Sequence, residues 1–218
     1  MKVSNSLDLL LDARLYVLVD GRESPDRFAA LVQSLVSAGV DVLQLRDKRL
    51  SDRELAQRAR LIRRLTCDTT TLFIVNDRPD IAVLSDADGV HVGQDELTVA
   101  DCRTIVGPHR LVGVSTHDLA QARRALTDGA DYIGCGPTFP SQTKRFEDYP
   151  GLDFLRAAQA EIRLPAFAIG GINQGNVARV LDIGFRRVAV GAAVTAANDP
   201  AVAAGALREA VCGGATFP

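Results

Sequence analysis

The stretch AGVDVLQLRDK (residues 38–48) contains, in order, the end of a helix, a short strand and a polar turn. Gly39 follows an apolar helical stripe, and glycine is the usual residue where a helix ends in the left-handed cap conformation. The next segment, 42–45, is short and largely apolar, as expected of a strand buried on both faces of a parallel sheet. Residues 38–48 therefore predict a helix–strand–loop junction of an α/β protein.

The same junction recurs along the chain. Short apolar segments return at spacings of roughly 20 to 35 residues, with the composition of buried parallel strands. The predicted strands are 15–19, 42–45, 72–75, 89–92, 111–114, 132–135, 166–169 and 188–190. Helix-period stretches separate them, at 25–38, 52–65, 79–85, 98–105, 118–128, 152–160, 173–182 and 200–211.

Eight such units in 218 residues predict a compact barrel. Each unit averages about 27 residues, which favours a single (β/α)8 TIM barrel with eight parallel strands and outer helices. We expect one domain over residues 1–218, with an ordered core over about 13–212. A doubly wound open sheet is the alternative, but its GxGxxG turn does not follow the first strand, where residues 20–24 read DGRES.

Composition excludes several classes of protein. The chain has 25 Lys+Arg and 27 Asp+Glu, a formal net charge of −2, which argues against a bulk nucleic-acid binder. Apolar residues make up 47% and charged residues 24%, as in a globular domain. No apolar run approaches the ~18 residues of a membrane helix, and no secretion signal is visible, so we expect a cytoplasmic protein with reduced cysteines.

Polar and glycine-rich groups follow seven of the predicted strands. In a barrel the carboxyl ends of all strands meet at one mouth, so these groups should come together in space. They are residues 44–48, 76–78, 91–96, 115–117, 136–144, 170–173 and 191–193.

The charges at this mouth indicate two anionic ligand regions. Arg46, Lys48 and Lys144 suit phosphate oxygens. Gly170-Gly171 and Gly191-Ala192 stand where the seventh and eighth loops of this fold usually hold phosphate. Asp77 and the pair Asp95/Glu96 add hard oxygen donors, which beside phosphates favour a magnesium ion. We therefore expect a metal-bound pyrophosphate and a separate monophosphate.

Each of these motifs also has a purely structural interpretation. Arg46 and Asp47 could form a surface ion pair, Asn76-Asp77 could cap a helix, and Asp95-Glu96 could be first-turn acids of a helix. His91 and His117 are better explained as structural than as catalytic residues, and Cys135 as a small buried hydrophobe.

Seven motifs in order resemble one known family. They are QLRDK (44–48), VNDR (75–78), GVHVGQ (89–94), GVSTH (113–117), GPTFPSQTK (136–144), IGGI (169–172) and VAVG (188–191). Over roughly residues 15–211 the chain resembles thiamine-phosphate synthase, also called thiamine-phosphate pyrophosphorylase. Together the motifs are specific, whereas any one alone would not be.

The resemblance implies a transferase of thiamine (vitamin B1) biosynthesis. It joins 4-amino-2-methyl-5-(diphosphooxymethyl)pyrimidine to a thiazole phosphate, giving thiamine phosphate and pyrophosphate, in a (β/α)8 barrel with Mg²⁺. The implied catalytic residues are Arg46, Lys48, Ser115 and Lys144. The implied contacts to the diphosphate substrate are Gln44, Leu45, Arg46, Asp47, Lys48, Asn76, Ser115 and Lys144. Those to the thiazole phosphate are Ser141, Gln142, Thr143, Gly171, Gly191 and Ala192.

Two positions depart from the family pattern. Asp77 matches the first magnesium ligand, but the second ligand, usually Asp, is Glu96 here, with Asp95 beside it. Either residue could serve, so the choice between them is open. The family usually has Thr where this chain has Ser141, which keeps the hydroxyl.

The chemistry agrees with the residues at the mouth. A thiazole nitrogen attacking a CH₂ carbon loses no proton, so no general base is required. The difficult step is the departure of pyrophosphate from carbon, which cations and a metal would favour. We expect a dissociative, carbocation-like path. The alternatives are a thiazole tautomerase, another phosphate-binding barrel enzyme and a catalytically inactive metabolite sensor. Expected partners are small-molecule substrates, with no nucleic acid and no membrane, and a homo-oligomer is left open.

Overall fold

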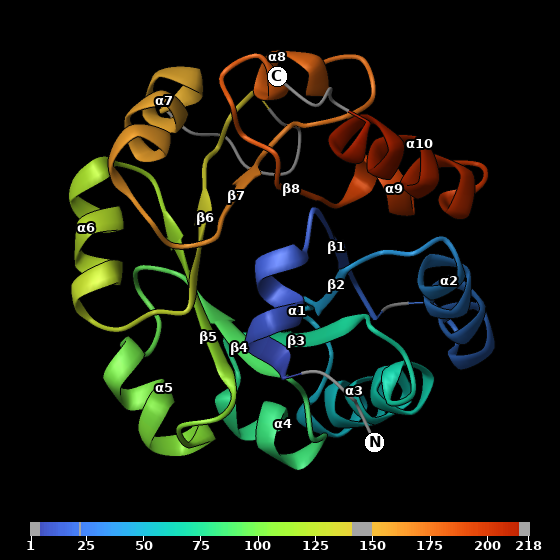
Figure 1. Ribbon diagram of the computed structural model, residues 1–218. Coiled ribbons are helices and arrows are strands. Elements are labelled where there is room, and N and C mark those ends of the chain that lie inside the picture. Colours follow the sequence, from blue (N-terminus) through green and yellow to red (C-terminus); the bar gives the residue numbers. More distant parts are fainter. Residues whose placement is uncertain (1–4, 22, 141–149, 214–218) are drawn as a thin grey trace.

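In the computed structural model the described residues are 5–21, 23–140 and 150–213. They form a closed barrel in which each parallel strand pairs with its neighbours in chain order and the eighth pairs with the first (Figure 1). The strands are β1 (Leu15–Val19), β2 (Val42–Leu45), β3 (Leu72–Asn76), β4 (Gly89–Val92), β5 (Leu111–Thr116), β6 (Tyr132–Cys135), β7 (Ala166–Ile169) and β8 (Val188–Val190). The fold predicted from the sequence is confirmed.

Helices surround the strands on the outside of the barrel (Figure 1). They are α2 (Pro25–Ser37), α3 (Asp52–Thr66), α4 (Pro79–Leu84), α5 (Val99–Val106), α6 (Leu119–Thr127), α7 (Gly151–Glu161), α8 (Val177–Leu181), α9 (Ala192–Thr195) and α10 (Pro200–Cys212). Local sequence accounts for their starts: Ser51 caps α3 in a capping box with Glu54, and Pro25 is the first residue of α2.

The predicted helix over 173–182 is shorter in the structure, where α8 starts only at Val177. The Asn176 side chain accepts a hydrogen bond from the backbone N–H of Asn173 and donates one to the carbonyl of Gly171. Asparagine side chains that bond nearby backbone in this way favour a turn over a helix.

Side chains alternate along each strand between two packed layers. Val17, Leu43 and Phe73 lie in the large cluster between strands and helices. Tyr16 and Tyr132 lie in a smaller cluster inside the barrel, with Val42, Leu72, Ile74, Leu111, Phe167 and Ala189. The period of two along a strand fixes which residues face inward, and so which reach the mouth.

A further helix, α1 (Ser6–Asp12), precedes the barrel, where the sequence predicted no element. Leu10 of α1 is fully buried in the interior cluster with the first residues of β2, β3 and β5. In Figure 1 α1 lies across the middle of the ring of strands. It therefore closes the amino end of the barrel. Within the described residues, no helix is both long and apolar enough to cross a bilayer.

Candidate active site

The carboxyl end of β2 brings Gln44 and Arg46 to the mouth. Gln44 faces the barrel interior, is 3% exposed, and donates from Nε2 to the Tyr16 hydroxyl at 2.7 Å. Arg46, next on the same face, is half-buried and forms no ion pair within the described part of the chain. Its guanidinium is therefore available to an anion at the mouth.

Two predicted substrate contacts of this segment, Leu45 and Asp47, have structural roles in the fold. The Leu45 side chain is fully buried in the layer between strands and helices, so it points away from the mouth. The Asp47 carboxylate accepts backbone N–H groups of Arg49 at 2.8 Å, Leu50 at 3.2 Å and Gly21 at 3.2 Å. Asp47 thus shapes its own loop and ties it to the loop after β1.

Lys48 lies between two acidic residues from different strand ends. Its Nζ is 3.1 Å from Asp77 Oδ2 and 3.1 Å from Glu96 Oε1. These two carboxylates, Asp77 first, raise the pKa of Lys48 above its usual value. The Asp77 side chain is 19% exposed and that of Glu96 is 28% exposed, so both are partly shielded from water. Two carboxylates that converge on one positive group define a position for a cation.

The local backbone aims both carboxylates at this position. Asp77, directly after β3, has a φ of +60°, which is uncommon for a residue other than glycine. Its N–H donates to the carbonyl of His91 at 2.8 Å. Glu96 folds back over Gly93, where a Cβ atom would overlap the Glu96 carboxylate. Asp95 is exposed, so the geometry favours Glu96 as the second acidic ligand.

The structural interpretations of these acids do not hold in the described residues. Helix α4 has Arg78 as its N-cap, without a side-chain cap, so Asp77 does not cap it. Helix α5 begins at Val99 with Thr98 as its cap, so Asp95 and Glu96 precede its first turn. Arg46 and Asp47 form no ion pair with each other in the described chain.

The opposite wall of the mouth is built from glycines. Gly170 and Gly171 follow β7 with φ values of +98° and +68°, and both approach residues 137–140 too closely for any side chain. Gly191 follows β8 and is the N-cap of α9, which begins at Ala192. Among the described residues, no acceptor is seen for the N–H of Gly171 or Gly191. These donors suit the oxygens of a phosphate.

A chain of buried hydrogen bonds crosses the barrel below the mouth. Tyr16 and Tyr132 hydroxyls are 3.1 Å apart, Tyr132 lies 3.2 Å from His91 Nδ1, and His91 Nε2 lies 2.9 Å from Ser115 Oγ. Burial, and then the nearby Arg46 charge, lower the pKa of His91 to about 4, so it is neutral near pH 7. Burial raises the pKa of both tyrosines.

Sequence reasoning missed Tyr16 and Tyr132 in this chain, because a tyrosine in a strand is most often a core residue. Gly113 could have indicated Tyr132: it lies on the neighbouring strand, and a Cβ there would overlap the Tyr132 ring. The expected role of Cys135 is confirmed, since it is fully buried and burial raises its pKa to about 12. His117 Nδ1 lies 2.6 Å from the Gly136 carbonyl oxygen, a structural contact.

Other predicted site residues have the following positions. Asn76 ends β3, beside His91 of β4, and is partly buried at the mouth. Ser141, Gln142, Thr143 and Lys144 lie outside the described residues. In the described part of the chain, no group of three or more His, Cys, Asp or Glu residues converges as a metal cluster.

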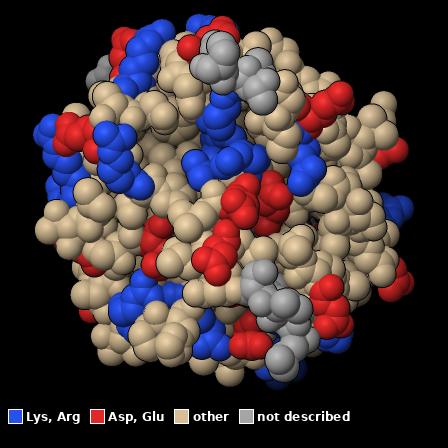
Figure 2. All heavy atoms as spheres, viewed as in Figure 1, with Lys and Arg blue, Asp and Glu red and all other residues tan. Residues whose placement is uncertain are grey.

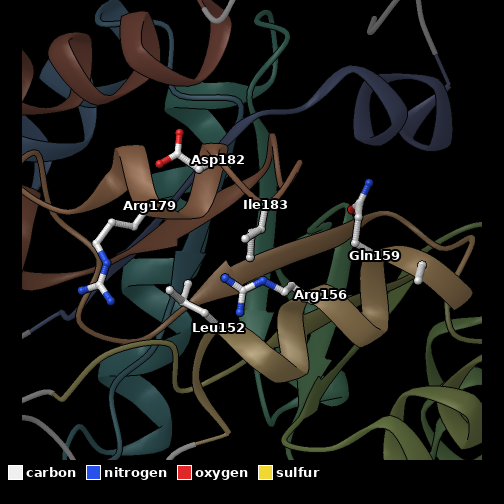
Figure 3. Close-up of a pocket in the computed structure, with 7 residues that line it drawn as sticks. Leu152, Arg156, Gln159, Arg179, Asp182 and Ile183 are labelled. Carbon is white, nitrogen blue, oxygen red and sulfur yellow. The ribbon is translucent and has the colours of Figure 1, made fainter.

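Two open grooves lie beside α7 and α8, one of them reaching the loop after β6, and neither is lined by Asp77. One of about 640 Å³ is lined by Leu152, Arg156, Gln159, Ala160, Arg179, Asp182 and Ile183 (Figure 3). The other, of about 520 Å³, adjoins it and reaches Phe139, over whose ring the Arg179 guanidinium lies at 4.9 Å. Arg156 and Arg179 are exposed, and Arg156 pairs with Asp153. Among the described residues, neither groove therefore offers a buried polar side chain that lacks a partner.

Comparison with known proteins shows the family to which the sequence is similar. A family model described as thiamine monophosphate synthase matches residues 15–194. A thiamine-phosphate synthase of Rhodopirellula baltica is 51% identical over 186 residues, which are 83% of this chain but 50% of that protein. One of Chloroflexus aurantiacus is 44% identical over 208 residues, covering 94% of this chain and 96% of its own length.

A solved structure supports the same relationship. The thiamine phosphate pyrophosphorylase of Pyrococcus furiosus superposes with a TM-score of 0.84 at 34% identity, over 94% of this chain and 98% of that one. The chain thus spans about half the length of the Rhodopirellula relative and nearly all of the other two.

Proposed function

Because the chain belongs to the thiamine monophosphate synthase family, we propose that it catalyses the family's condensation. In that reaction 4-amino-2-methyl-5-(diphosphooxymethyl)pyrimidine and a thiazole phosphate form thiamine phosphate, and pyrophosphate leaves. The observation that carries the proposal is the division of the mouth into two walls. Arg46, Lys48, Asp77 and Glu96 gather on one wall, and Gly171 and Gly191 lie on the other. This arrangement suits a diphosphate with a cation beside a monophosphate.

A magnesium ion fits the residues present. Asp77 and Glu96 already converge on a positive group, the Lys48 ammonium, and both donate hard oxygens. Magnesium needs few protein ligands when substrate phosphates complete its shell, so two carboxylates suffice. When bound, the ion would stabilise negative charge on the departing pyrophosphate.

The chain's own residues supply the rest of the catalysis. Arg46 would bind the diphosphate and stabilise the charge that grows on it as its bond to carbon breaks. Lys48, which holds the two carboxylates together here, would donate to the same leaving group. The glycine N–H groups would hold the thiazole phosphate so that its nitrogen faces the reacting carbon. No side chain has to remove a proton, which agrees with His91, since its pKa of about 4 makes it a weak base and both of its ring nitrogens have protein partners.

Incubation of the purified full chain with both phosphorylated heterocycles and Mg²⁺ tests the proposal. We expect stoichiometric thiamine phosphate and pyrophosphate, and neither product when one heterocycle is left out. Turnover of the thiazole phosphate alone would point to a tautomerase instead. Excess chelator should abolish turnover and added Mg²⁺ restore it; unchanged activity in chelator would remove the metal from the reaction.

Two matters outside the chemistry stay predictions. We expect the protein in the cytoplasm, which cell fractionation would test. A homo-oligomer is left open, and light scattering of the purified protein would decide it.

A further inference from the structure

Five side chains form one continuous hydrogen-bonded chain through the barrel. It runs from Gln44 on β2 through Tyr16, Tyr132 and His91 to Ser115 on β5, with separations of 2.7, 3.1, 3.2 and 2.9 Å. Its three middle members are 8% exposed or less, so water does not compete for these bonds. Both ends of the chain, Gln44 and Ser115, belong to the implied diphosphate site.

The number of hydrogens on each group determines which partner donates at each step of this hydrogen-bonded series. The Gln44 amide donates to Tyr16, so the Tyr16 hydroxyl hydrogen needs an acceptor, and Tyr132 is the one within reach. Tyr132 must then donate to His91 Nδ1, which leaves the imidazole hydrogen on Nε2 facing Ser115. With the Gln44 amide oriented so that Nε2 donates to Tyr16, the reverse direction would leave the buried Tyr16 hydroxyl without an acceptor among the described residues, at a cost of roughly 1–3 kcal/mol.

We propose that His91 is a positioning residue: its Nε2–H donates to Ser115 Oγ and thereby turns the Ser115 hydroxyl hydrogen into the mouth, toward a diphosphate oxygen. A hydroxyl whose lone pair is already occupied by a donor is ordered before the substrate arrives. It then acts as a fixed donor to the leaving group rather than as a freely rotating one. The inference rests on the proposed function for the identity of that acceptor.

The surrounding packing holds this arrangement in one geometry. The Tyr132 ring fills the space that Gly113 leaves without a side chain, and Phe167 packs edge-on against both tyrosine rings. Gly134 on β6 lies under the His91 ring, where a Cβ would be 3.5 Å from Cε1. The Tyr132 ring therefore requires glycine at position 113, whereas a Cβ at Gly134 would make only an ordinary contact with His91. This hydrogen-bonded series orients the His91 ring and the Ser115 hydroxyl and transfers no proton, because burial keeps both tyrosines protonated and His91 neutral.

The tautomer of His91 can be observed directly. With only three histidines in the chain, ¹⁵N-histidine labelling and a long-range ¹H–¹⁵N spectrum resolve each ring, and a His91→Gln variant assigns the signals. We expect neutral His91 protonated on Nε2 at pH 7. Protonation on Nδ1 would reverse the chain and overturn the proposal.

A double-mutant cycle tests the link to Ser115. Tyr132→Phe removes one oxygen, releases His91 Nδ1 and should lower kcat about tenfold with little change in KM. In a Ser115→Ala background the same change should alter kcat less than twofold, because no hydroxyl is left to orient. Equal effects in both backgrounds would show a merely structural role and overturn the proposal. If Tyr132→Phe does not fold, Tyr16→Phe breaks the chain one link earlier.

Thr71→Val is the matched control. It also removes a buried hydroxyl, from the residue directly before β3, where it donates to the Val40 carbonyl at the far end of the barrel. It should lower Tm and leave kcat within twofold. If the wild-type protein makes no thiamine phosphate, the proposed function is wrong. The same double-mutant cycle can then be measured with the affinity for magnesium pyrophosphate in place of kcat. The His91 tautomer and that binding then decide the inference on their own.

Discussion

At the amino end of the barrel, acidic residues are bonded to backbone and to arginines, whereas at the mouth Asp77 and Glu96 face Lys48. Asp41, Asp88 and Asp131 each precede an even-numbered strand and accept an N–H from the strand before it, at 2.7–2.8 Å. They also pair with Arg208, Arg63 and Arg103, respectively. Figure 2, viewed onto the end that carries α1, shows positive and negative side chains side by side there.

This difference in partners indicates that charged residues at the amino end serve stability and that those at the mouth serve function. At the amino end the three acids have fixed protein partners, so their charges stabilise the fold. At the mouth Arg46 has no ion pair in the described residues, and the carboxylates of Asp77 and Glu96 share one partner, Lys48. Under the proposed function, these groups gain further partners when the substrate and the metal bind. Substitutions at the two ends should therefore act on different quantities.

The largest effect is expected at the mouth. Arg46→Ala should lower kcat/KM roughly 30- to 1000-fold, by analogy with the loss of one transition-state donor worth about 2–4 kcal/mol. Its Tm should stay near that of the wild type. Steady-state kinetics and a thermal melt check this. Arg27→Ala, on an 81% exposed side chain of α2, is the control and should change neither. Near-normal turnover of Arg46→Ala would contradict a catalytic role for Arg46 at the mouth.

At the amino end, loss of the α1 anchor should affect stability alone. Leu10→Ala removes a fully buried side chain and should cost about 3 kcal/mol of the free energy of unfolding. Urea titration measures this. Leu11→Ala, 48% exposed on the same helix, should cost less than about 1 kcal/mol. A large loss of kcat in folded Leu10→Ala protein would show that the two ends are coupled.

The acid–backbone bonds can be tested in the same way. Asp88→Ala leaves the Phe73 N–H and the Arg63 guanidinium short of a buried acceptor, and should cost about 2–3 kcal/mol. Asp153→Ala, on a 94% exposed side chain, should cost less than about 0.5 kcal/mol. Equal stabilities of the two variants, in parallel urea titrations, would contradict the structural role of Asp88.

Acidification should lower the stability of the protein through His91, which lies in the buried hydrogen-bonded series below the mouth. The folded pKa of His91 is about 4, below its value of about 6.5 in an unfolded chain, so the unfolded state takes up the proton first as pH falls. Its contribution to stability should be constant above pH 6.5 and decline between 6.5 and 4, with a loss of about 2 kcal/mol at pH 5. Urea titrations of wild type and His91→Gln between pH 7 and 5 isolate this effect. Parallel declines in both proteins would count against it.

The strands could be predicted from the sequence because each is short and largely apolar, and because helix-period stretches separate them. The mouth was readable because polar residues follow seven strands in turn. The closure of the barrel by α1 was not, since only the fold shows that Leu10 meets the starts of β2, β3 and β5. The same holds for Asp47, whose residue type suits a ligand contact equally well, and for the buried pairing of Tyr16 with Tyr132.

The sequence by itself determined the order of elements, the residues at each strand end and the membership of a family, because these depend on local periodicity and on motifs. Only the tertiary structure decided that Glu96 rather than Asp95 faces Asp77, that Leu45 points outward and that His91 reaches both Tyr132 and Ser115. Those relations join residues from different strands. Their distances depend on register and barrel closure, which no local stretch of sequence specifies.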